Sequence, residues 1–446
     1  MTDPTRFGSL REHALVIWEA AVEAVRPEIL IPDAFTNPSF GIQEAVARAR
    51  RVIVVGAGKA GAAMSAALEN LPVSISKMEG MVNVPAEAVR SLRAIRLHPA
   101  RPSGTNQPTA EGVEGARRIL DLLASAGPDD VAIGLWSGGG SALLPAPVEG
   151  VSLADKQMVT QLLHECGATI NQMNAVRKHL SRVKGGQLAQ AFAGRDFYNL
   201  IISDVIGDPL DVIASGPTAA DSSTFGDAVA VLEKYALKPQ VPAVVWEHLN
   251  QGLQGLVPET PKSISDRIHN LIIGNNSLAL DGGRAMAEAL GFRVLNLGST
   301  IEGETEQIAA AMAGTVRSMA ADSMPSNRPV CLLSGGETTV TLGKEHGLGG
   351  RNQEFVLAAV TKLGRHGMAN VVVLSGGTDG EDGPTDAAGA VADSETLEKA
   401  HKLAMSPIDF LTRHDAYHFF NPIGGLIKTG LTQTNVMDVR VILIGS

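Results

Sequence analysis

The sequence predicts an α/β fold with two domains, and three observations support that prediction. The chain has 446 residues, which exceeds the length that one hydrophobic core usually serves. Six short apolar runs have the length of buried strands, and stretches of helical character lie between them. Each run ends in small or polar residues, and ligands of open α/β sheets bind at the carboxyl ends of strands. The six runs are Val52–Val55, Ala132–Trp136, Leu200–Ile202, Leu271–Ile273, Val330–Leu333 and Val371–Leu374.

The composition narrows the class of protein. It contains 44% apolar and 19% charged residues, as is typical of a globular protein, and its formal net charge of −10 argues against nucleic acid or an anionic membrane as the main partner. Two cysteines are too few for a disulfide framework. The N-terminal stretch carries charges among its apolar positions and predicts an amphipathic helix, not a signal peptide. We therefore expect a cytoplasmic enzyme or binding protein without transmembrane spans, with self-association left open.

The first glycine loop follows the first apolar run. After two predicted helices, at 10–26 and 43–51, the strand at 52–55 leads into Gly56, Gly58 and Gly61, whose spacing fits the dinucleotide-binding fingerprint of Rossmann folds. The acidic residue that usually binds the ribose is missing at the end of the next predicted strand, which reads Asn-Val-Pro. Lys59 inside the loop suits a phosphate or another concentrated anion. The alternative is an exposed lysine in a first helical turn.

The second glycine loop follows the run that ends at Trp136. Ser137, Gly138 and Gly139 belong to a loop whose backbone N–H groups could surround an anion. Ser141 follows, but the sequence around it lacks the GxSxG elbow of a serine nucleophile.

A basic stretch and an acidic turn complete the first half. Arg177, Lys178, Arg182 and Lys184 lie close together, and we weigh a binding role for Lys184 against ordinary surface charge. In the stretch after Ile202, Asp204 and Asp208 are four residues apart. They suit either Mg²⁺ or the capping of a backbone turn.

We place the domain boundary near residue 240, which gives domains 1–240 and 241–446. The stretch from 219 to 266 is predicted as a connection with one helix. A second α/β unit follows, with strands at 270–273 and 293–297 and helices at 277–290 and 303–320.

The second half holds the stretch on which the functional prediction depends most. Ser334 and Glu337 follow an apolar run, and Arg351 follows a second glycine cluster at a predicted helix start. An arginine there can donate to a carboxylate or a phosphate. An acidic, glycine-rich loop with Asp379 and Asp386 follows the last of the six runs, and we favour a magnesium or substrate-hydroxyl site there.

Long motifs in this order closely resemble the glycerate 2-kinase family, whose C-terminal half carries the MOFRL region. They are VVGAGKAG, LWSGGGSALL, NAVRKHLSRVKGG, IISDVIGDPLDVIASGPT, LLSGGETTV, GGRNQE and LSGGTDGEDGPTDAAGA. The resemblance implies two α/β domains, the first Rossmann-like, with the active site in the interdomain cleft. It also implies transfer of the ATP γ-phosphoryl group to the 2-hydroxyl of D-glycerate, with Mg²⁺ and ATP required.

The resemblance assigns roles to single residues. Lys59, Asp204 and Arg351 are expected to be catalytic, with Lys59 and Arg351 contacting phosphate and the glycerate carboxylate. Asp208 and Asp379 are expected to bind the metal. Residues expected to bind substrate or nucleotide are Gly56, Gly58, Ser137, Gly138, Gly139, Lys184, Asn276, Ser334, Glu337 and Asp386.

The chain departs from the family pattern in two places. Two other functions are also considered. Leu431 and Gln433 replace turn formers near the C-terminus, and LHPARP is one residue longer than the usual His-Pro-x-Pro. Members of the family are also labelled hydroxypyruvate reductase, which would require NADH or NADPH. A non-catalytic sugar-acid binding protein is the third possibility.

Overall fold

The computed structural model describes residues 9–72, 77–102, 107–321 and 329–445. The chain forms two compact units, Leu30–Ile273 and the combination of Met1–Ile29 with Gly274–Ser446. The boundary therefore lies at 273/274, not near 240, and the N-terminal helix joins the C-terminal half. Residue 240 falls within the first unit because the apolar face of α11 (Ala243–Leu253) packs with α10 (Phe225–Lys234) in one core.

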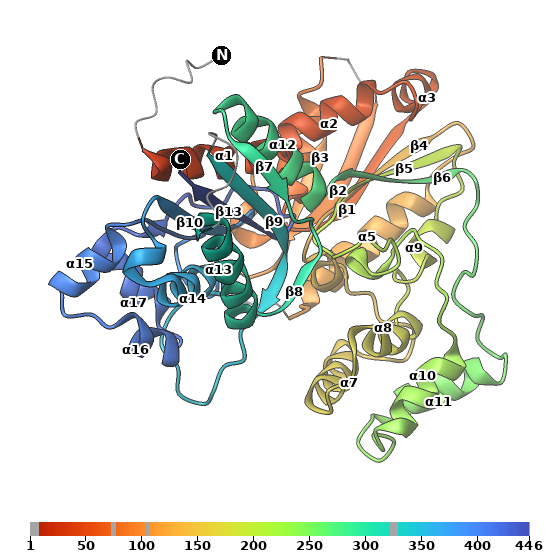
Figure 1. The fold of residues 1–446 in the computed structure, drawn as a ribbon. Helices are drawn as coiled ribbons and strands as arrows, with labels where there is room; N and C mark the ends of the chain where they lie inside the picture. The colour runs from red at the N-terminus through yellow and green to blue at the C-terminus, as the bar shows by residue number, and fades with distance from the viewer. Residues whose placement is uncertain (1–8, 73–76, 103–106, 322–328, 446) are drawn as a thin grey trace. The chain divides into compact units, whose positions relative to one another are not determined.

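The unit Leu30–Ile273, here called the Rossmann-like unit, contains a six-stranded sheet in the order β3-β2-β1-β4-β5-β6 (Figure 1). The pairs β1–β2, β2–β3, β1–β4 and β4–β5 are parallel. This strand order is that of dinucleotide-binding folds, and it confirms the Rossmann-like prediction. The chain moves outward in opposite directions from β1 and β4, so the carboxyl ends of these two strands form the topological switch point. The strands are β1 (Val52–Ala57), β2 (Met78–Pro85), β3 (Ile95–Arg101), β4 (Val131–Trp136), β5 (Asp196–Ile202) and β6 (Ile268–Gly274).

The helices of this unit form two groups. One covers the sheet and includes α5, which begins after its N-cap Thr109 and buries Ile119 and Leu123 against β1. In the other, α7, α8, α10 and α11 lie together around a separate core (Figure 1). The stretch 219–266 thus holds two helices where one was predicted. The remaining helices are α2 (Pro27–Thr36), α3 (Ile42–Arg48), α4 (Gly61–Glu69), α5 (Ala110–Ala124), α6 (Gly140–Leu143), α7 (Leu153–Glu165), α8 (Ile170–His179) and α9 (Gln187–Gln190).

The other unit, here called the mixed-sheet unit, has strands in the order β12-β11-β10-β13-β9-β7, with β8 also paired to β9. Strand β13 is antiparallel to both β9 and β10, whereas β7 and β8 are parallel to β9. The first residue of β13, Asp438, therefore lies opposite Gly336 of β9 and Gly377 of β10. The strands are β7 (Arg293–Asn296), β8 (Ile301–Glu304), β9 (Val330–Thr339), β10 (Val371–Gly377), β11 (Gly389–Ala392), β12 (Leu426–Ile427) and β13 (Asp438–Ile444).

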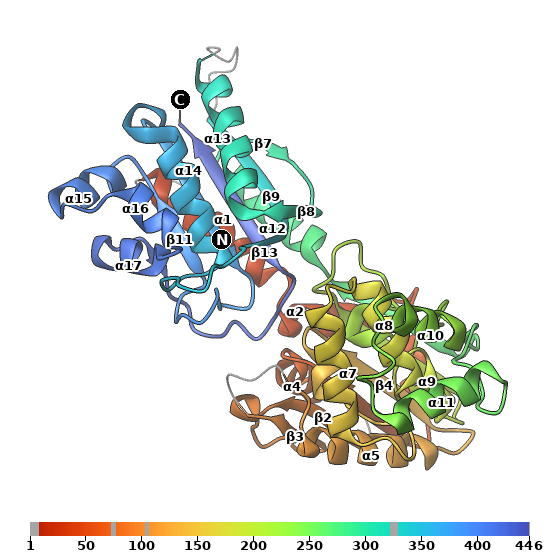
Figure 2. The same ribbon diagram turned by 90° about the horizontal axis from the view of Figure 1, so that it is seen from below.

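Helices cover both faces of the mixed sheet. On one face α1 packs against α12, β10 and β13, and the Trp18 indole donates to the Gly376 carbonyl at 3.2 Å. On the other face α13 and α14 lie side by side (Figure 2) and bury Met312 and Phe355 against Leu332 and Ile442. The helices are α1 (Leu10–Glu23), α12 (Asn276–Ala289), α13 (Thr305–Ala321), α14 (Arg351–Gly367), α15 (Thr396–Lys402), α16 (Pro407–Thr412) and α17 (Ala416–Phe420).

Two of the expected strand ends differ from the prediction. The Ser-Gly-Gly sequences at 334 and 375 lie inside β9 and β10, because pairing with β13 extends both strands through their glycines. Ser137, in contrast, directly follows β4 as expected. No helix among the described residues has both the length and the apolar character of a membrane span.

Candidate active site

The two glycine loops of the Rossmann-like unit meet at the switch point. The Lys59 N–H donates to the Gly138 carbonyl at 2.8 Å, and the Ala60 N–H donates to the Ser137 hydroxyl at 3.0 Å. A Cβ on Gly139 would lie 3.6 Å from Lys59 Cγ, so the lysine side chain passes beside that glycine. The structure thus brings together Lys59 and the loop Ser137–Gly139, where Rossmann folds bind their ligands.

The glycines of the first loop permit close packing. A Cβ on Gly58, whose φ is 149°, would lie 2.1 Å from Ser137 Oγ, and one on Gly56 would lie 2.3 Å from the Leu135 carbonyl oxygen. A Cβ on Gly61 would lie 2.9 Å from Val82. In dinucleotide sites the second glycine leaves room for the pyrophosphate. Here the Ser137 side chain fills that space.

The end of β2 lacks the group that would bind a nicotinamide ribose. Asn83 occupies that position, and its side chain is fully buried. Its amide donates to the carbonyls of Gly112 at 3.3 Å and Leu143 at 2.8 Å. Asn83 therefore connects the sheet to α5 and α6.

Asp204 lies just beyond the carboxyl end of β5, where the sequence predicted it. Asp208 follows in the turn after it and has a left-handed backbone with a φ of 55°. Strained backbone of this kind concentrates at functional sites. Both aspartates are half-buried.

Lys184 is buried beside the residues that follow the second glycine loop. Its ammonium donates to the carbonyl of Ser141 at 2.9 Å and to the hydroxyl of Ser141 at 2.8 Å. Lys178 is instead paired with acids: it contacts Asp211 at 3.2 Å and Asp221 at 3.1 Å.

Arg351 is the centre of a polar cluster in the mixed-sheet unit. It is the first residue of α14, and its Nη1 donates to Glu337 of β9 at 2.5 Å. Nε and Nη2 donate to the two carboxylate oxygens of Asp438. Burial lowers the pKa of Arg351, but the charges of Asp438 and Glu337 outweigh that effect and raise the pKa above its usual value. A third of the Arg351 side chain, 33%, is exposed.

Two buried acids hold the first turn of α14. Asp382 accepts the N–H groups of Asn352 at 3.0 Å and Gln353 at 2.9 Å, so it caps the helix. Asp438 accepts the Asn352 amide at 2.9 Å. Burial raises the pKa of Asp382 to about 6, even though these N–H groups lower it.

Glu337 and Asp379 add negative charge to this cluster. Burial raises the pKa of Glu337, and the charges of Asp438 and Asp379 raise it further, against the opposing effect of Arg351. Asp379 follows β10, and its carboxylate accepts the Glu381 N–H at 3.1 Å.

Three of the predicted site residues make contacts other than those of the Arg351 cluster. The Ser334 side chain is buried against Met312. Asn276 is buried, and its amide donates to the carbonyls of Val436 and Asp438. Asp386 forms an exposed ion pair with Lys428 at 3.0 Å.

The sequence analysis did not single out Asp438 and Asn352, which hold Arg351 and the start of α14 in place. The polar residues expected at the edge of a sheet all follow an apolar run. Asp438 precedes its strand, and the antiparallel direction of β13 brings it to the same edge as the ends of β9 and β10. The sequence signal for Asp438 is an aspartate directly before the strand-like stretch 439–444.

A magnesium ion carried by ATP is compatible with these side chains. In the described parts of the chain, no group of at least three His, Cys, Asp or Glu side chains could hold a metal ion by itself. However, Mg²⁺ that is bound to a nucleotide commonly takes only one or two protein carboxylates. In the Arg351 cluster, both carboxylate oxygens of Asp438 accept from Arg351, and Asp382 accepts two N–H groups of α14, so these two acids hold the start of the helix and not a metal.

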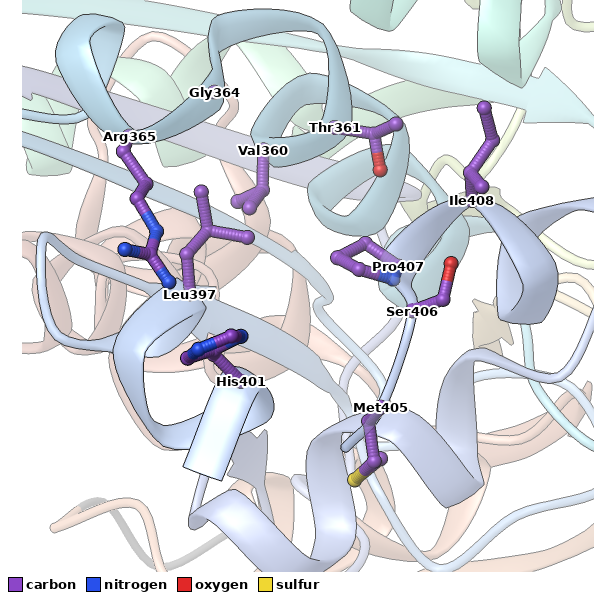
Figure 3. Close-up of a pocket in the computed structure, with 10 residues that line it drawn as sticks. All are labelled: Val360, Thr361, Gly364, Arg365, Leu397, His401, Met405, Ser406, Pro407 and Ile408. Carbon is purple, nitrogen blue, oxygen red and sulfur yellow. The ribbon is translucent and has the colours of Figure 1, made fainter. Parts of the chain in front are cut away.

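A cavity of about 330 Å³ lies elsewhere in the mixed-sheet unit. It is lined by the C-terminal half of α14, by α15 and by the start of α16. Arg365, Leu397 and His401 lie on one side, and Thr361, Ser406, Pro407 and Ile408 on the other (Figure 3). None of the predicted site residues lines it, and it holds no carboxylate, so we do not place the chemistry there.

Two family descriptions match this chain. Residues 13–250 match a domain of unknown function, DUF4147, and residues 330–438 match the MOFRL family. The first match spans the switch-point loops. The second covers Arg351 and the acids around it.

Individual relatives are similar over nearly the whole chain. A glycerate 2-kinase of Pyrococcus horikoshii is 38% identical over 89% of this chain and 88% of its own length. A protein of Agrobacterium vitis with the provisional name hydroxypyruvate reductase is 38% identical over 98% of this chain and 95% of its own. The crystal structure of a glycerate kinase from Thermotoga maritima has a TM-score of 0.85 and 35% identity, and covers 98% of this chain and 99% of that one.

Proposed function

This chain belongs to the glycerate 2-kinase family, and from that premise we propose that it transfers the γ-phosphoryl group of ATP to the 2-hydroxyl of D-glycerate. The products are ADP and 2-phosphoglycerate. The observation that carries the proposal is the switch point of the Rossmann-like unit. There Lys59 and the loop Ser137–Gly139 form one structure, and the position near the end of β2 where an acid would bind a ribose holds the buried Asn83.

Phosphoryl transfer depends on positioning and on neutralising charge on the transferred oxygens. We assign contact with the transferred phosphate to Lys59, because its loop lies where parallel sheets bind ligands. Asp204, beyond β5, accepts the proton of the glycerate hydroxyl while that oxygen forms its bond to the γ-phosphorus. The bond from the γ-phosphorus to the bridging oxygen breaks, and ADP leaves with that electron pair.

We assign the glycerate carboxylate to Arg351. Its bidentate contact with Asp438 fixes the guanidinium plane, and the exposed part of the side chain keeps further N–H donors for a substrate. Glu337 shares Nη1 and limits rotation of the group. An arginine held in this way can bind a planar carboxylate with little loss of side-chain entropy.

Mg²⁺ belongs to the proposal as an ion that arrives with ATP. Asp379 of the mixed-sheet unit or Asp208 of the Rossmann-like unit would supply a protein oxygen to it. When bound, it neutralises charge on the phosphate oxygens. The cytoplasm is the proposed compartment, because ATP is available there and both cysteines, Cys166 and Cys331, are free.

Hydroxypyruvate reduction is the second candidate, because the strand order and the Gly56-Gly58-Gly61 spacing match dinucleotide-binding folds. Two observations weigh against it. Ser137 fills the space beside Gly58 that a pyrophosphate would need, and Asn83 is buried where an acid would contact the ribose.

Phosphorus NMR tests the proposal directly. The purified protein is mixed with ATP, Mg²⁺ and D-glycerate, without coupling enzymes, and a parallel sample receives hydroxypyruvate with NADH or NADPH. We expect ADP and a 2-phosphoglycerate resonance in the first sample only. Oxidation of the nicotinamide in the second sample, with no reaction in the first, would replace the kinase with the reductase.

A further inference from the structure

Three cationic side chains gather beside the second glycine loop of the Rossmann-like unit. Lys156 comes from α7, Arg177 from α8, and Lys184 from the turn after α8. We call these three residues the buried cation cluster. Lys156 is 9% exposed and Lys184 is 4% exposed, whereas Arg177 is half-buried and opens the cluster to solvent on one side.

Every hydrogen-bond acceptor that contacts this cluster in the described parts of the chain is neutral. Arg177 Nη2 donates to the Ser141 hydroxyl at 2.6 Å, and Lys184 donates to the same hydroxyl at 2.8 Å. Ser215 Oγ lies 2.9 Å from Ser141 Oγ and 3.4 Å from Lys184 Nζ. Lys156 Nζ is buried and has no hydrogen-bond partner in the described residues.

Lys178 provides a comparison within the same helix. It follows Arg177 directly and is only 3% exposed, but it contacts the carboxylates of Asp211 and Asp221. A buried cation needs a paired acid, or the loss of its proton, to offset the cost of leaving water. Within the described residues, acids therefore pair with Lys178 and none pairs with the three cations next to it.

This arrangement disfavours the charged forms of the two lysines and lowers their pKa values. Burial and the nearby Arg177 charge lower the pKa of Lys156 to about 7. Burial, with the charges of Arg177, Lys156 and Lys178, lowers the pKa of Lys184 well below its usual value. An anion that entered the cluster would favour the charged forms and raise both pKa values.

The backbone beside the cluster is also unusual. Ala214 and Ser215 are consecutive non-glycine residues with positive φ, 51° and 62°. Such conformations are costly and concentrate at ligand sites, where the surrounding structure enforces them. In this case they place the Ser215 hydroxyl next to Ser141 and Lys184.

We propose that Lys156, Arg177 and Lys184 form a binding site for a phosphate group, held against the hydroxyls of Ser141 and Ser215. The proposal rests on the proposed function, which supplies ATP and 2-phosphoglycerate as the two sources of such a group. The D-glycerate carboxylate carries a single charge and would neutralise one of the three cations. A phosphate monoester or a polyphosphate carries two or more charges and matches the cluster better.

The test is isothermal titration calorimetry of the full chain with three ligands, ADP, 2-phosphoglycerate and D-glycerate. The variants are Lys156→Met and Arg177→Met. Matched controls are Lys234→Met, at an exposed lysine of α10, and Arg182→Met, at an exposed arginine of the same basic stretch. We expect each cluster variant to bind the phosphate-bearing ligand at least about tenfold more weakly and the controls to bind as wild type. The ligand whose affinity falls more is the one whose phosphate group occupies the cluster.

Two further readouts separate a binding role from a structural one. Titration at pH 8 in two buffers of different ionisation enthalpy should reveal proton uptake on binding, and Lys156→Met should reduce it. Lys156→Met should also keep or raise the Tm of the ligand-free protein, because it removes a buried polar group that has no hydrogen-bond partner in the described residues. Weakened binding together with an unchanged or higher Tm supports the proposal.

The proposal would be overturned if both cluster variants bound ADP and 2-phosphoglycerate as wild type does, or if only D-glycerate affinity fell. Failure of this inference is distinguishable from failure of the proposed function. Wild-type phosphorus NMR reports the kinase reaction whatever the variants do. If the cluster variants weakened ADP binding but the wild-type protein did not phosphorylate glycerate, this inference would hold and the proposed function would fail.

Discussion

Arg351 donates to both carboxylate oxygens of Asp438, from Nε at 2.8 Å and from Nη2 at 3.0 Å, and the Asp438 carboxylate is fully buried. The first residue of β13 thereby sets the orientation of the first residue of α14. A bidentate contact of this kind fixes the plane of the guanidinium group and not only its position. The chemistry proposed for Arg351 therefore depends on an acid distant in sequence.

Replacing Asp438 by Asn should reduce activity without removing the fold. The amide accepts only one guanidinium N–H, so Arg351 loses its fixed plane, and we expect kcat/KM to fall about 10- to 100-fold. The control is Asp281→Asn in α12, which changes an exposed ion pair with Arg284 in the same unit. Steady-state kinetics of both variants provide the comparison, and equal losses would show that the Arg351–Asp438 geometry has no special role.

Lys59→Ala and Arg351→Ala should each lower kcat/KM for D-glycerate by about 100-fold or more, because each removes a charge assigned to the reacting groups. Far-ultraviolet circular dichroism should show that both variants keep their secondary structure. Wild-type rates in either variant would refute the role given to that residue. Arg351→Lys is a useful companion, since it retains the charge but loses the bidentate geometry.

Asp382 should make stability depend on pH. Its folded pKa is about 6, above the ordinary aspartate value of 3.8, so the folded state binds more protons than the unfolded state between these two values. The stability that this group contributes is therefore complete below pH 3.8 and is lost as the pH rises through about 6. Asp382→Asn should remove this dependence while losing part of the α14 cap, at about 1 kcal/mol.

Denaturant unfolding of wild type and Asp382→Asn at several pH values between 4 and 7 measures this difference. The free energy of unfolding of wild type should fall relative to the variant across that range. A constant difference would show that Asp382 stays ionised throughout.

The two cysteines should differ in reactivity. Cys331 is fully buried in β9, and burial raises the pKa of its thiol to about 12, whereas Cys166 is partly exposed. Thiol reagents act on the thiolate, so at pH 8 we expect only Cys166 to react in the native protein. Both should react after unfolding. A Cys166→Ser variant that still consumed reagent in its native state would contradict the prediction.

Much of the fold was predictable because it depends on local patterns. Short apolar runs followed by glycines indicated β1 and β4, and the glycine spacing at Gly56, Gly58 and Gly61 indicated a Rossmann-like unit. Thr109 is of a residue type that is favoured at helix N-caps, and it caps α5. These features are encoded within a few residues, where sequence reasoning is strongest.

The features that could not be predicted depend on pairings between distant segments. Ser334 was expected at a strand end, but partnership with β13 extends β9 beyond it and turns its side chain into the core. Asp438 was missed because only the antiparallel direction of β13 brings it to Arg351. Lys156 was missed because an isolated lysine in an amphipathic stretch is normally exposed.

The membership of α1 in the mixed-sheet unit has a consequence for biosynthesis. The ribosome makes α1 before the Rossmann-like unit, and it makes α12 and β13, against which α1 packs, only after that unit. Domains generally fold as units while translation proceeds. The Rossmann-like unit can thus fold as a nascent chain, whereas the apolar face of α1, including Trp18, must wait until the C-terminal strand leaves the exit tunnel. A chaperone that shields this helix in the interval would protect the slowest part of the molecule to assemble.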